Sequence, residues 1–259
     1  MPLQQADHQL GVLATQLGHA VTAILELPNL PIASARSSVY LKCYSITFRQ
    51  RQVPTTVSPV VEGDSQPILS KLHEPDVTLA VWHRSLPCRL ADWLDSLPRE
   101  QLPEAQFTGP AACVAQRAAT VCDFVGLPDS AERRALVNDI AALAQAFARL
   151  ARSQDIDLRL EAVDHDSCWR FHRDHVGLRL NTTYRGPGTQ WLPPEHAPRA
   201  LKAQRRYRGP LNEMPRFAVG LFKGVERAGA DAVVHRSPPV VGTGQTRLFL
   251  CLNEVRDDG

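Results

Sequence analysis

The feature that most constrains this chain is a change of pattern at Asp155, where helical periodicity gives way to short alternating runs. From there on, about 100 residues carry seven such runs, separated by turn-forming segments such as residues 185–188. Short strands at this spacing are typical of a small antiparallel sandwich or barrel. The runs are residues 157–163, 168–174, 176–184, 189–193, 217–222, 231–238 and 246–255.

Before Asp155 the sequence predicts mostly helices. Ser130 is a suitable N-cap for a helix over residues 130–152, in which apolar side chains recur on one face. Residues 9–26 and 88–97 show the same periodicity. Residues 76–87 differ, because their apolar run predicts a short buried strand that ends in a turn.

These patterns predict an α+β fold in two regions. Residues 1–153 form a mostly helical region that packs on a barrel, and residues 154–259 form that barrel, a C-terminal double-stranded β-helix of the jelly-roll or cupin-like kind. Because no flexible linker intervenes near residue 153, one compact domain overall is also consistent with the sequence. Residues 194–215 are too polar and broken for core strands, and we expect them to cross the mouth of the barrel.

The composition argues against several classes of partner. A net charge of +2, from 29 basic and 27 acidic side chains, does not favour nucleic acid, a membrane surface or an acidic partner. No apolar run approaches the roughly 18 residues of a membrane span, and six cysteines without CxxC spacing are typical of reduced thiols. We therefore expect a cytoplasmic protein.

A possible metal site lies in two of the β runs. On a strand, side chains two apart share a face, so His172 and Asp174 are expected to point together into the barrel. His235 ends an apolar run 61 residues after Asp174, and strands so far apart can be neighbours in a jelly roll. Two histidines and one carboxylate leave open positions on a metal and are diagnostic of non-haem Fe(II) oxygenases.

Arg247 extends this pattern. It stands twelve positions after His235, behind a turn that contains Gly242 and Gly244, and begins a strand expected to return antiparallel to that of His235. A guanidinium there can grip a carboxylate in bidentate fashion, as the distal end of 2-oxoglutarate requires.

The spacing of the HxD motif, the distant histidine and the following arginine resembles the 2-oxoglutarate/Fe(II) dioxygenase superfamily. The resemblance implies His172, Asp174 and His235 as metal ligands, Arg247 as the co-substrate arginine, and Tyr184 or Thr182 as a second co-substrate contact. It also implies Fe(II), 2-oxoglutarate as co-substrate and O2, with oxidative decarboxylation to succinate and CO2 and hydroxylation of a small-molecule or protein substrate.

Residues 171–192, 234–239 and 247–253 are also similar to a bacterial family known as domain of unknown function 1826. The similarity extends over most of the chain and includes residues 76–87. It implies no assigned activity, but it suggests an association with zinc-responsive gene neighbourhoods.

Other interpretations remain open at this point. His172 and Asp174 could form a buried hydrogen-bonded pair, and the protein could be a cupin-like enzyme that holds zinc or another metal without 2-oxoglutarate, or a non-catalytic metal sensor. Arg179, Asn181 and Trp191 are candidate substrate contacts, although Arg179 would also suit a salt-bridged strand position. The basic run at residues 199–208 could recognise an anionic substrate such as a nucleotide, phosphate or acidic peptide, form a lid, or simply be solvated.

Overall fold

The computed structural model describes residues 58–255, which all belong to the compact unit of residues 54–259. Its framework is a seven-stranded sheet in which only β1 and β2 are parallel. All other neighbouring pairs are antiparallel. The strands, in spatial order, are β1 (Val60–Gly63), β2 (Leu79–Trp82), β8 (Val219–Lys223), β5 (Leu178–Arg185), β10 (Arg247–Glu254), β4 (Asp155–Val163) and β3 (Ala105–Pro110).

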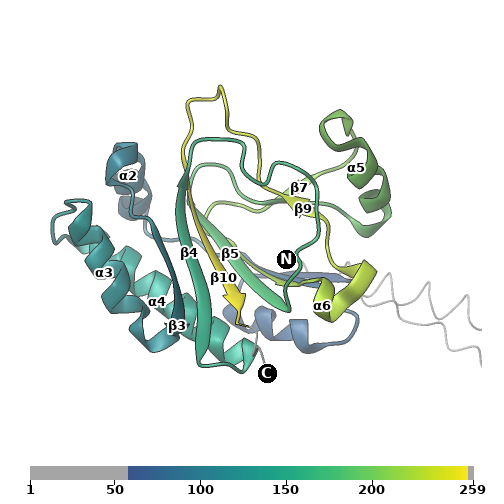
Figure 1. Ribbon diagram of the computed structural model, residues 1–259, viewed down its shortest axis with the longest axis horizontal. Coiled ribbons are helices and arrows are strands. Elements are labelled where there is room, and N and C mark those ends of the chain that lie inside the picture. The colour runs from purple at the N-terminus through teal and green to yellow at the C-terminus, as the bar shows by residue number, and fades with distance from the viewer. Residues whose placement is uncertain (1–57, 256–259) are drawn as a thin grey trace, which may run out of the picture. The chain divides into compact units, whose positions relative to one another are not determined.

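A smaller sheet faces one side of this framework, and three of the helices, α2 (Cys88–Ser96), α3 (Val114–Phe124) and α4 (Ala131–Ala151), cover the other side (Figure 1). The small sheet has the order β7 (Asn212–Glu213), β6 (Gln190–Trp191) and β9 (His235–Arg236). Further α-helices are α5 (Ala197–Ala203) and α6 (Val225–Ala228). The 3-10 helices are η2 (Gln66–His73), η3 (Arg99–Gln101), η4 (Ala111–Cys113), η5 (Pro194–His196), η6 (Gln204–Arg206) and η7 (Gly229–Asp231).

Alternation along the central strands gives the large sheet two chemically different faces. Even-numbered residues of β4 and β10, such as Leu158 and Leu250, enter the core that α2, α3 and α4 cover. Odd-numbered residues such as Arg179, Asn181 and Arg247 lie on the other face, toward the small sheet. Arg179, Asn181 and Arg247 are therefore gathered on the side of the small sheet.

The longest helix forms where its sequence predicts it. The Ser130 hydroxyl accepts a hydrogen bond from the Arg133 amide at 3.1 Å, which satisfies one of the free donors at the N-terminus of α4. The helix ends at Arg152, whose φ of 57° is left-handed. The predictions of helices over residues 130–152 and 88–97 and of a strand within 76–87 are confirmed, whereas residues 9–26 lie outside the described residues.

The β structure differs from the prediction in two respects. The large sheet is not confined to the C-terminal half, because β1, β2 and β3 precede residue 153 and β3 pairs directly with β4. In addition, β1 and β3 are the edges of the large sheet, and the described strands do not close into a barrel. The α+β class is confirmed, with a large, mostly antiparallel sheet facing a smaller one, whereas the C-terminal placement and the closed barrel are not confirmed.

Most of the predicted β runs contain a strand. Residues 168–174 do not: only His172 pairs with another strand residue, through an isolated bridge to His235. Residues 194–215, expected to lack core strands, contain η5, α5, η6 and the two residues of β7. Among the described residues, no helix is both long and apolar enough to cross a membrane.

Candidate metal centre

A two-residue bridge brings the two predicted histidines together. The amide of His172 donates to the carbonyl of His235 and the amide of His235 to the carbonyl of His172, both at 3.0 Å. Residues paired in this way project their side chains on the same side, and the two imidazole centroids are 4.7 Å apart. The antiparallel bridge thus replaces the regular strand that the sequence predicted for His172.

Asp174 completes the cluster from the turn that leads into β5. Its Oδ1 lies 3.5 Å from Nε2 of His172, and its Oδ2 lies 3.2 Å from Nε2 of His235. The ligand atoms of the three residues all lie within 4.8 Å of one another, and no other group of three or more His, Cys, Asp or Glu in residues 58–255 has this geometry. The convergence that the metal hypothesis requires is therefore present.

Main-chain carbonyls determine which nitrogen of each imidazole faces Asp174. Nδ1 of His172 is 2.8 Å from the carbonyl oxygen of Arg170, and Nδ1 of His235 is 3.1 Å from that of Val233. Because a carbonyl oxygen can only accept, each Nδ1 must carry the proton and donate it. In the neutral rings Nε2 is then the free lone pair, which is the arrangement that metal-binding histidines use.

The carboxylate of Asp174 is held in its ionised form. Burial would raise its pKa, but His235, His172 and Arg179 outweigh burial and hold the pKa well below its usual range. Burial would likewise lower the pKa of His172, yet its hydrogen bond to Asp174 raises it. A buried anion beside two imidazoles is the charge distribution that suits a divalent cation.

Arg179 contacts the cluster from the next strand. Its Nη1 donates to Oδ1 of Asp174, while its Nε donates to Oδ1 of Asn253 at 2.7 Å. The amide nitrogen of Asn253 donates in turn to Asp157 at 2.9 Å. This chain of side chains fixes one carboxylate oxygen of Asp174 and leaves the other, Oδ2, buried without a hydrogen-bond partner.

Oδ2 of Asp174 lies 3.2 Å from Nε2 of His235 but accepts no hydrogen bond, and this observation tests whether a metal fits here. A buried carboxylate oxygen without a donor is costly, and each such oxygen in a native protein calls for an explanation. A divalent cation between Oδ2 and the two Nε2 atoms would satisfy all three lone pairs together. The residue set therefore fits a metal ion.

Arg247 lies at the far end of the same cavity, where it is 1% exposed. Its guanidinium donates to neutral acceptors: the Pro187 carbonyl at 2.8 Å, the Ser237 hydroxyl at 2.9 Å and the Thr183 hydroxyl at 3.2 Å. Burial lowers its pKa to about 10, so it remains a cation at neutral pH. A buried cation without a carboxylate partner suits an anionic ligand.

The cavity between these groups is small, with a volume of about 60 Å³. Both histidines line it together with Arg179, Asn181 and Arg247. Its size corresponds to about four water molecules.

Not all predicted residues reach this cavity. Tyr184 lies on the helical face of the sheet, where its hydroxyl donates to Asp139 on α4 at 2.6 Å. Thr182 shares that face by alternation, and its buried hydroxyl has no hydrogen-bond partner. The hydroxyl that contacts Arg247 belongs to Thr183, which the sequence interpretation missed. Continuing the alternation from Arg179 and Asn181 would have identified it.

The three candidate substrate residues have different surroundings. Asn181 lines the cavity, and its Oδ1 is buried without a hydrogen-bond partner. Arg179 is paired with Asp174. Trp191 instead packs in the apolar cluster between the two sheets, and its main chain pairs with that of His235. It therefore positions His235 and does not line the cavity.

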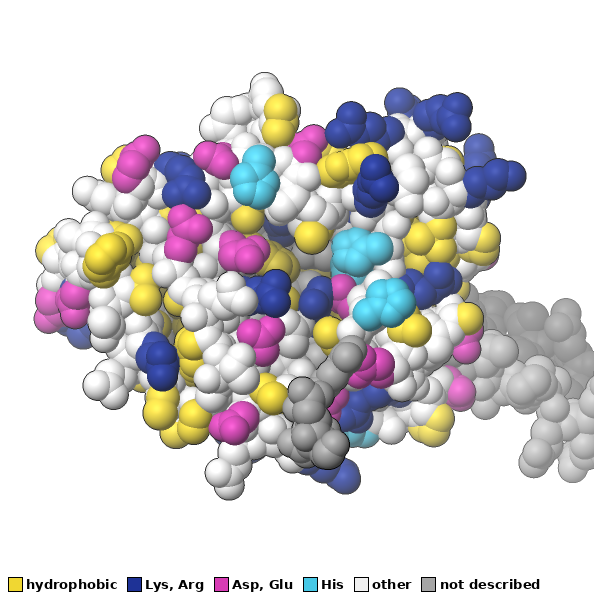
Figure 2. All heavy atoms as spheres, viewed as in Figure 1, with side chains coloured by type: hydrophobic (Ala, Val, Ile, Leu, Met, Phe, Trp, Pro, Cys, Tyr) yellow, Lys and Arg dark blue, Asp and Glu magenta, His cyan; other side chains and the backbone are white. Residues whose placement is uncertain are grey.

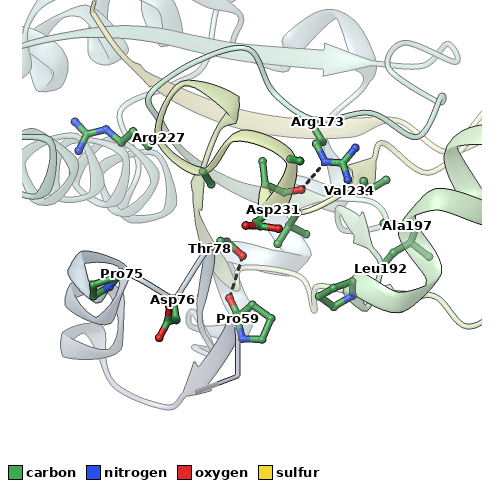
Figure 3. A pocket seen from close by; sticks show the side chains of 15 residues that line it. Pro59, Pro75, Asp76, Thr78, Arg173, Leu192, Ala197, Arg227, Asp231 and Val234 are labelled. Carbon is green, nitrogen blue, oxygen red and sulfur yellow. Dashed lines mark hydrogen bonds between the residues drawn. The ribbon is translucent and has the colours of Figure 1, made fainter. Parts of the chain in front are cut away.

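A larger cavity of about 360 Å³ is lined by residues that include Arg173 and Val234 (Figure 3). Arg173, which stands between His172 and Asp174, lines it with Val233 and Val234, and its Nε donates to the carbonyl of Ala232 at 2.9 Å. None of the three clustered residues lines this cavity. It is therefore separate from the candidate metal centre.

Comparison with known families gives one match. The family model described as "Protein of unknown function (DUF1826)" matches residues 63–253, which is well over half of the chain. No curated protein matches the chain.

The chain is similar to several solved structures. One is the apo Kdo hydroxylase KdoO, a non-haem Fe(II) α-ketoglutarate-dependent dioxygenase, which is 12% identical in sequence. The match covers 75% of this chain and 88% of that chain, with a TM-score of 0.39. A full-length Neurospora crassa protein in complex with α-ketoglutarate and 5-formyluracil is 14% identical, with coverages of 78% and 85% and a TM-score of 0.36. A bsmA homologue from Methylobium petroleophilum PM1 is 12% identical, with coverages of 76% and 96% and a TM-score of 0.37.

Proposed function

The chain belongs to the DUF1826 family, and we propose that it is a non-haem oxygenase that uses Fe(II), 2-oxoglutarate and O2 to hydroxylate a substrate. The observation that carries the proposal is a buried arginine, Arg247, without a carboxylate partner. It lines the same cavity as the two histidines of the His172, Asp174 and His235 cluster. A metal site alone would not require that arginine, whereas a dicarboxylate co-substrate would.

Nε2 of His172, Oδ2 of Asp174 and Nε2 of His235 would hold the metal. When bound, Fe(II) supplies the activation of O2 that is coupled to decarboxylation of 2-oxoglutarate to succinate and CO2. The protein contributes the order of the site. The main-chain acceptors of Arg170 and Val233 keep both imidazoles in the ligating tautomer, and Arg179 keeps Oδ2 of Asp174 turned toward them.

Arg247 would bind the distal carboxylate of the co-substrate. It is already oriented by three neutral acceptors, so little conformational entropy is lost when an anion binds. The hydroxyls of Thr183 and Ser237 lie at the same guanidinium and can donate to a carboxylate oxygen.

The proposal is tested on protein purified without oxygen. Metal analysis should find iron bound at about one atom per chain after anaerobic loading, and the loaded protein should release succinate from 2-oxoglutarate when O2 is admitted. Arg247→Met keeps much of the buried volume and removes the charge. It should raise the KM for 2-oxoglutarate at least about 30-fold while iron content stays unchanged.

Arg185→Met is the matched control, because Arg185 lies at the end of β5 and donates to the carbonyl of Leu97 away from the cavity. It should leave the KM unchanged. Bound metal without succinate release would favour the cupin-like metal enzyme or the metal sensor. Equal effects of the two arginine variants would remove the role assigned to Arg247.

A further inference from the structure

A strongly basic surface lies close to the candidate metal centre, although the whole chain has a net charge of only +2. Residues 199–208, on α5, η6 and the loop that follows, contain five basic and no acidic side chains. All five are exposed, and Figure 2 shows Lys and Arg side chains gathered over the position of α5 in Figure 1. We call this the basic surface; its residues are Arg199, Lys202, Arg205, Arg206 and Arg208.

Hydrogen bonds fix the basic surface to the metal-ligand segment. The side chain of Gln204 accepts from the amide of Phe171 at 2.9 Å and donates to the carbonyl of the same residue at 3.1 Å. The ring of Phe171 also packs edge-on against Tyr207 at 5.5 Å. Because Phe171 directly precedes His172, these contacts hold the basic surface next to the metal-ligand segment.

An aromatic side chain joins the two. The guanidinium of Arg205 lies 4.2 Å from the ring centroid of Trp169, and that of Arg170 lies 5.2 Å from it. Trp169 is partly exposed and stands three residues before His172, a separation of at most about 10 Å. Arginines beside a partly exposed aromatic ring are typical of surfaces that bind phosphates and stack bases.

The size of the cavity indicates how a substrate approaches. About 60 Å³ has space for about four water molecules and none for a substrate. The side chain of His172 is 34% exposed, so the metal centre opens to the surface on its side. A substrate must therefore bind outside and present one group at His172.

We propose that the basic surface, together with Trp169, docks single-stranded nucleic acid and presents a nucleotide to the metal centre. This substrate class rests on the proposed oxygenase function, whereas the docking itself does not. Arginines outnumber lysines four to one on the surface, which suits bidentate contacts with phosphate. Trp169 suits an unpaired base, and a base inside a duplex could not reach His172 without leaving the stack.

The docking is tested with metal-free protein and a fluorescein-labelled oligonucleotide of about twelve nucleotides that contains all four bases. Fluorescence anisotropy at low salt should show binding that weakens steeply as salt is added. The double variant Lys202→Glu/Arg206→Glu should weaken binding at least about tenfold. Its matched control is Arg89→Glu/Arg117→Glu, which makes the same change in net charge at exposed residues of α2 and α3 and should bind within about twofold of wild type.

Trp169→Ala tests the stacking contact and should weaken binding about tenfold without changing its salt dependence. Three results would overturn the docking proposal: no binding by wild type, equal weakening by both double variants, or binding of duplex DNA or phosphatidylglycerol vesicles through the same residues at equal or higher affinity. The last result would assign the basic surface to a duplex or a membrane surface.

The substrate assignment is tested on iron-loaded protein, where the oligonucleotide should increase succinate release. Oligonucleotide binding without this increase would overturn the substrate class. Complete absence of succinate, with oligonucleotide binding intact, would count against the proposed oxygenase function and leave the docking in place. The two proposals therefore fail in different experiments.

Discussion

Adjacent residues of β5 have opposite roles because the strand separates an apolar core from a polar site. Thr183 contacts Arg247, whereas Thr182 faces the helices with a hydroxyl that has no hydrogen-bond partner. A threonine-to-valine substitution keeps the shape and removes only the hydroxyl. The same substitution at these two positions therefore separates binding of the co-substrate from packing.

Thr183→Val should raise the KM for 2-oxoglutarate about five- to tenfold, because the hydrogen bond to a charged group is lost. Thr182→Val should leave the KM unchanged and be neutral or slightly stabilising, since it removes a buried hydroxyl without a partner. Succinate-release kinetics and denaturant unfolding measure the two effects. A higher KM for Thr182→Val, with Thr183→Val unchanged, would reverse the assignment of the two faces.

Arg179 positions a metal ligand without being one itself. Removing its bond to Oδ1 of Asp174 should lower the affinity for Mn(II) about 10- to 100-fold in Arg179→Met, because the carboxylate loses its fixed orientation. Competition titration against a chelator measures this affinity, and Arg185→Met serves as the control. If Arg179→Met instead bound the metal more tightly, Arg179 would be a competitor of the metal for Asp174.

Whole elements differ in how far the sequence predicts them. The ends of α4 depend on local features, a Ser130 cap and an apolar stripe, and the prediction over residues 130–152 is confirmed. Strand β3 has no comparable local signal, because Gly109 and Pro110 usually break strands. Proline is tolerated at the end of β3 because β3 is an edge of the sheet.

The candidate site also combines features that a local sequence pattern predicts with features that it does not. Alternation correctly suggested that His172 and Asp174 share a side, but it could not show that only His172 would find a bridge partner. The choice of Thr182 or Tyr184 rested on the resemblance to a superfamily and not on the two-residue period that relates Asn181 to Thr183. Closure of a barrel depends on contacts between distant strands, which no local pattern in the sequence specifies.

Gly224, at the end of β8, holds the turn that carries Asp174. The amide of Val225 donates to the carbonyl of Asp174 at 2.8 Å, and a Cβ built on Gly224 would lie 2.0 Å from the carbonyl oxygen of Val176. Gly224→Ala should therefore displace the turn and lower both Mn(II) affinity, at least about tenfold, and stability, by about 1–3 kcal/mol.

Gly229→Ala provides a comparison with a different cause of strain. A Cβ at Gly229 meets nothing within 4 Å, but its φ of 55° is left-handed, so alanine should cost stability of about 1 kcal/mol. Mn(II) affinity should be unchanged, since the hydrogen bonds that hold the turn of Asp174 come from Gly224 and Val225 and not from Gly229. Chelator competition and denaturant unfolding on both variants separate the two effects. Unchanged metal affinity in Gly224→Ala would show that β8 does not position Asp174.

At the scale of the whole molecule, the site depends on both sheets at once. Asp174 leads into the large sheet, and His235 belongs to the small one. Arg247 begins β10, which pairs with β4 and β5 in the centre of the large sheet. A metal bound by His172, Asp174 and His235 would thus add a link between the three segments that carry these residues.

A metal that binds only the folded state should therefore stabilise the whole unit. At a free Mn(II) concentration of 100 times Kd, the free energy of unfolding should rise by about 2.7 kcal/mol, which is roughly 5–10 °C in Tm for a unit of this size. His235→Ala should abolish this increase. The increase is measured between the metal-loaded and metal-free forms of the same protein, so a lower stability of the metal-free variant does not affect the comparison. Thermal unfolding followed by circular dichroism measures both. Loss of one of the three ligands should remove most of the metal affinity at the site formed by His172, Asp174 and His235. An equal metal-dependent rise in Tm for wild type and His235→Ala would therefore show that the stabilising metal binds elsewhere.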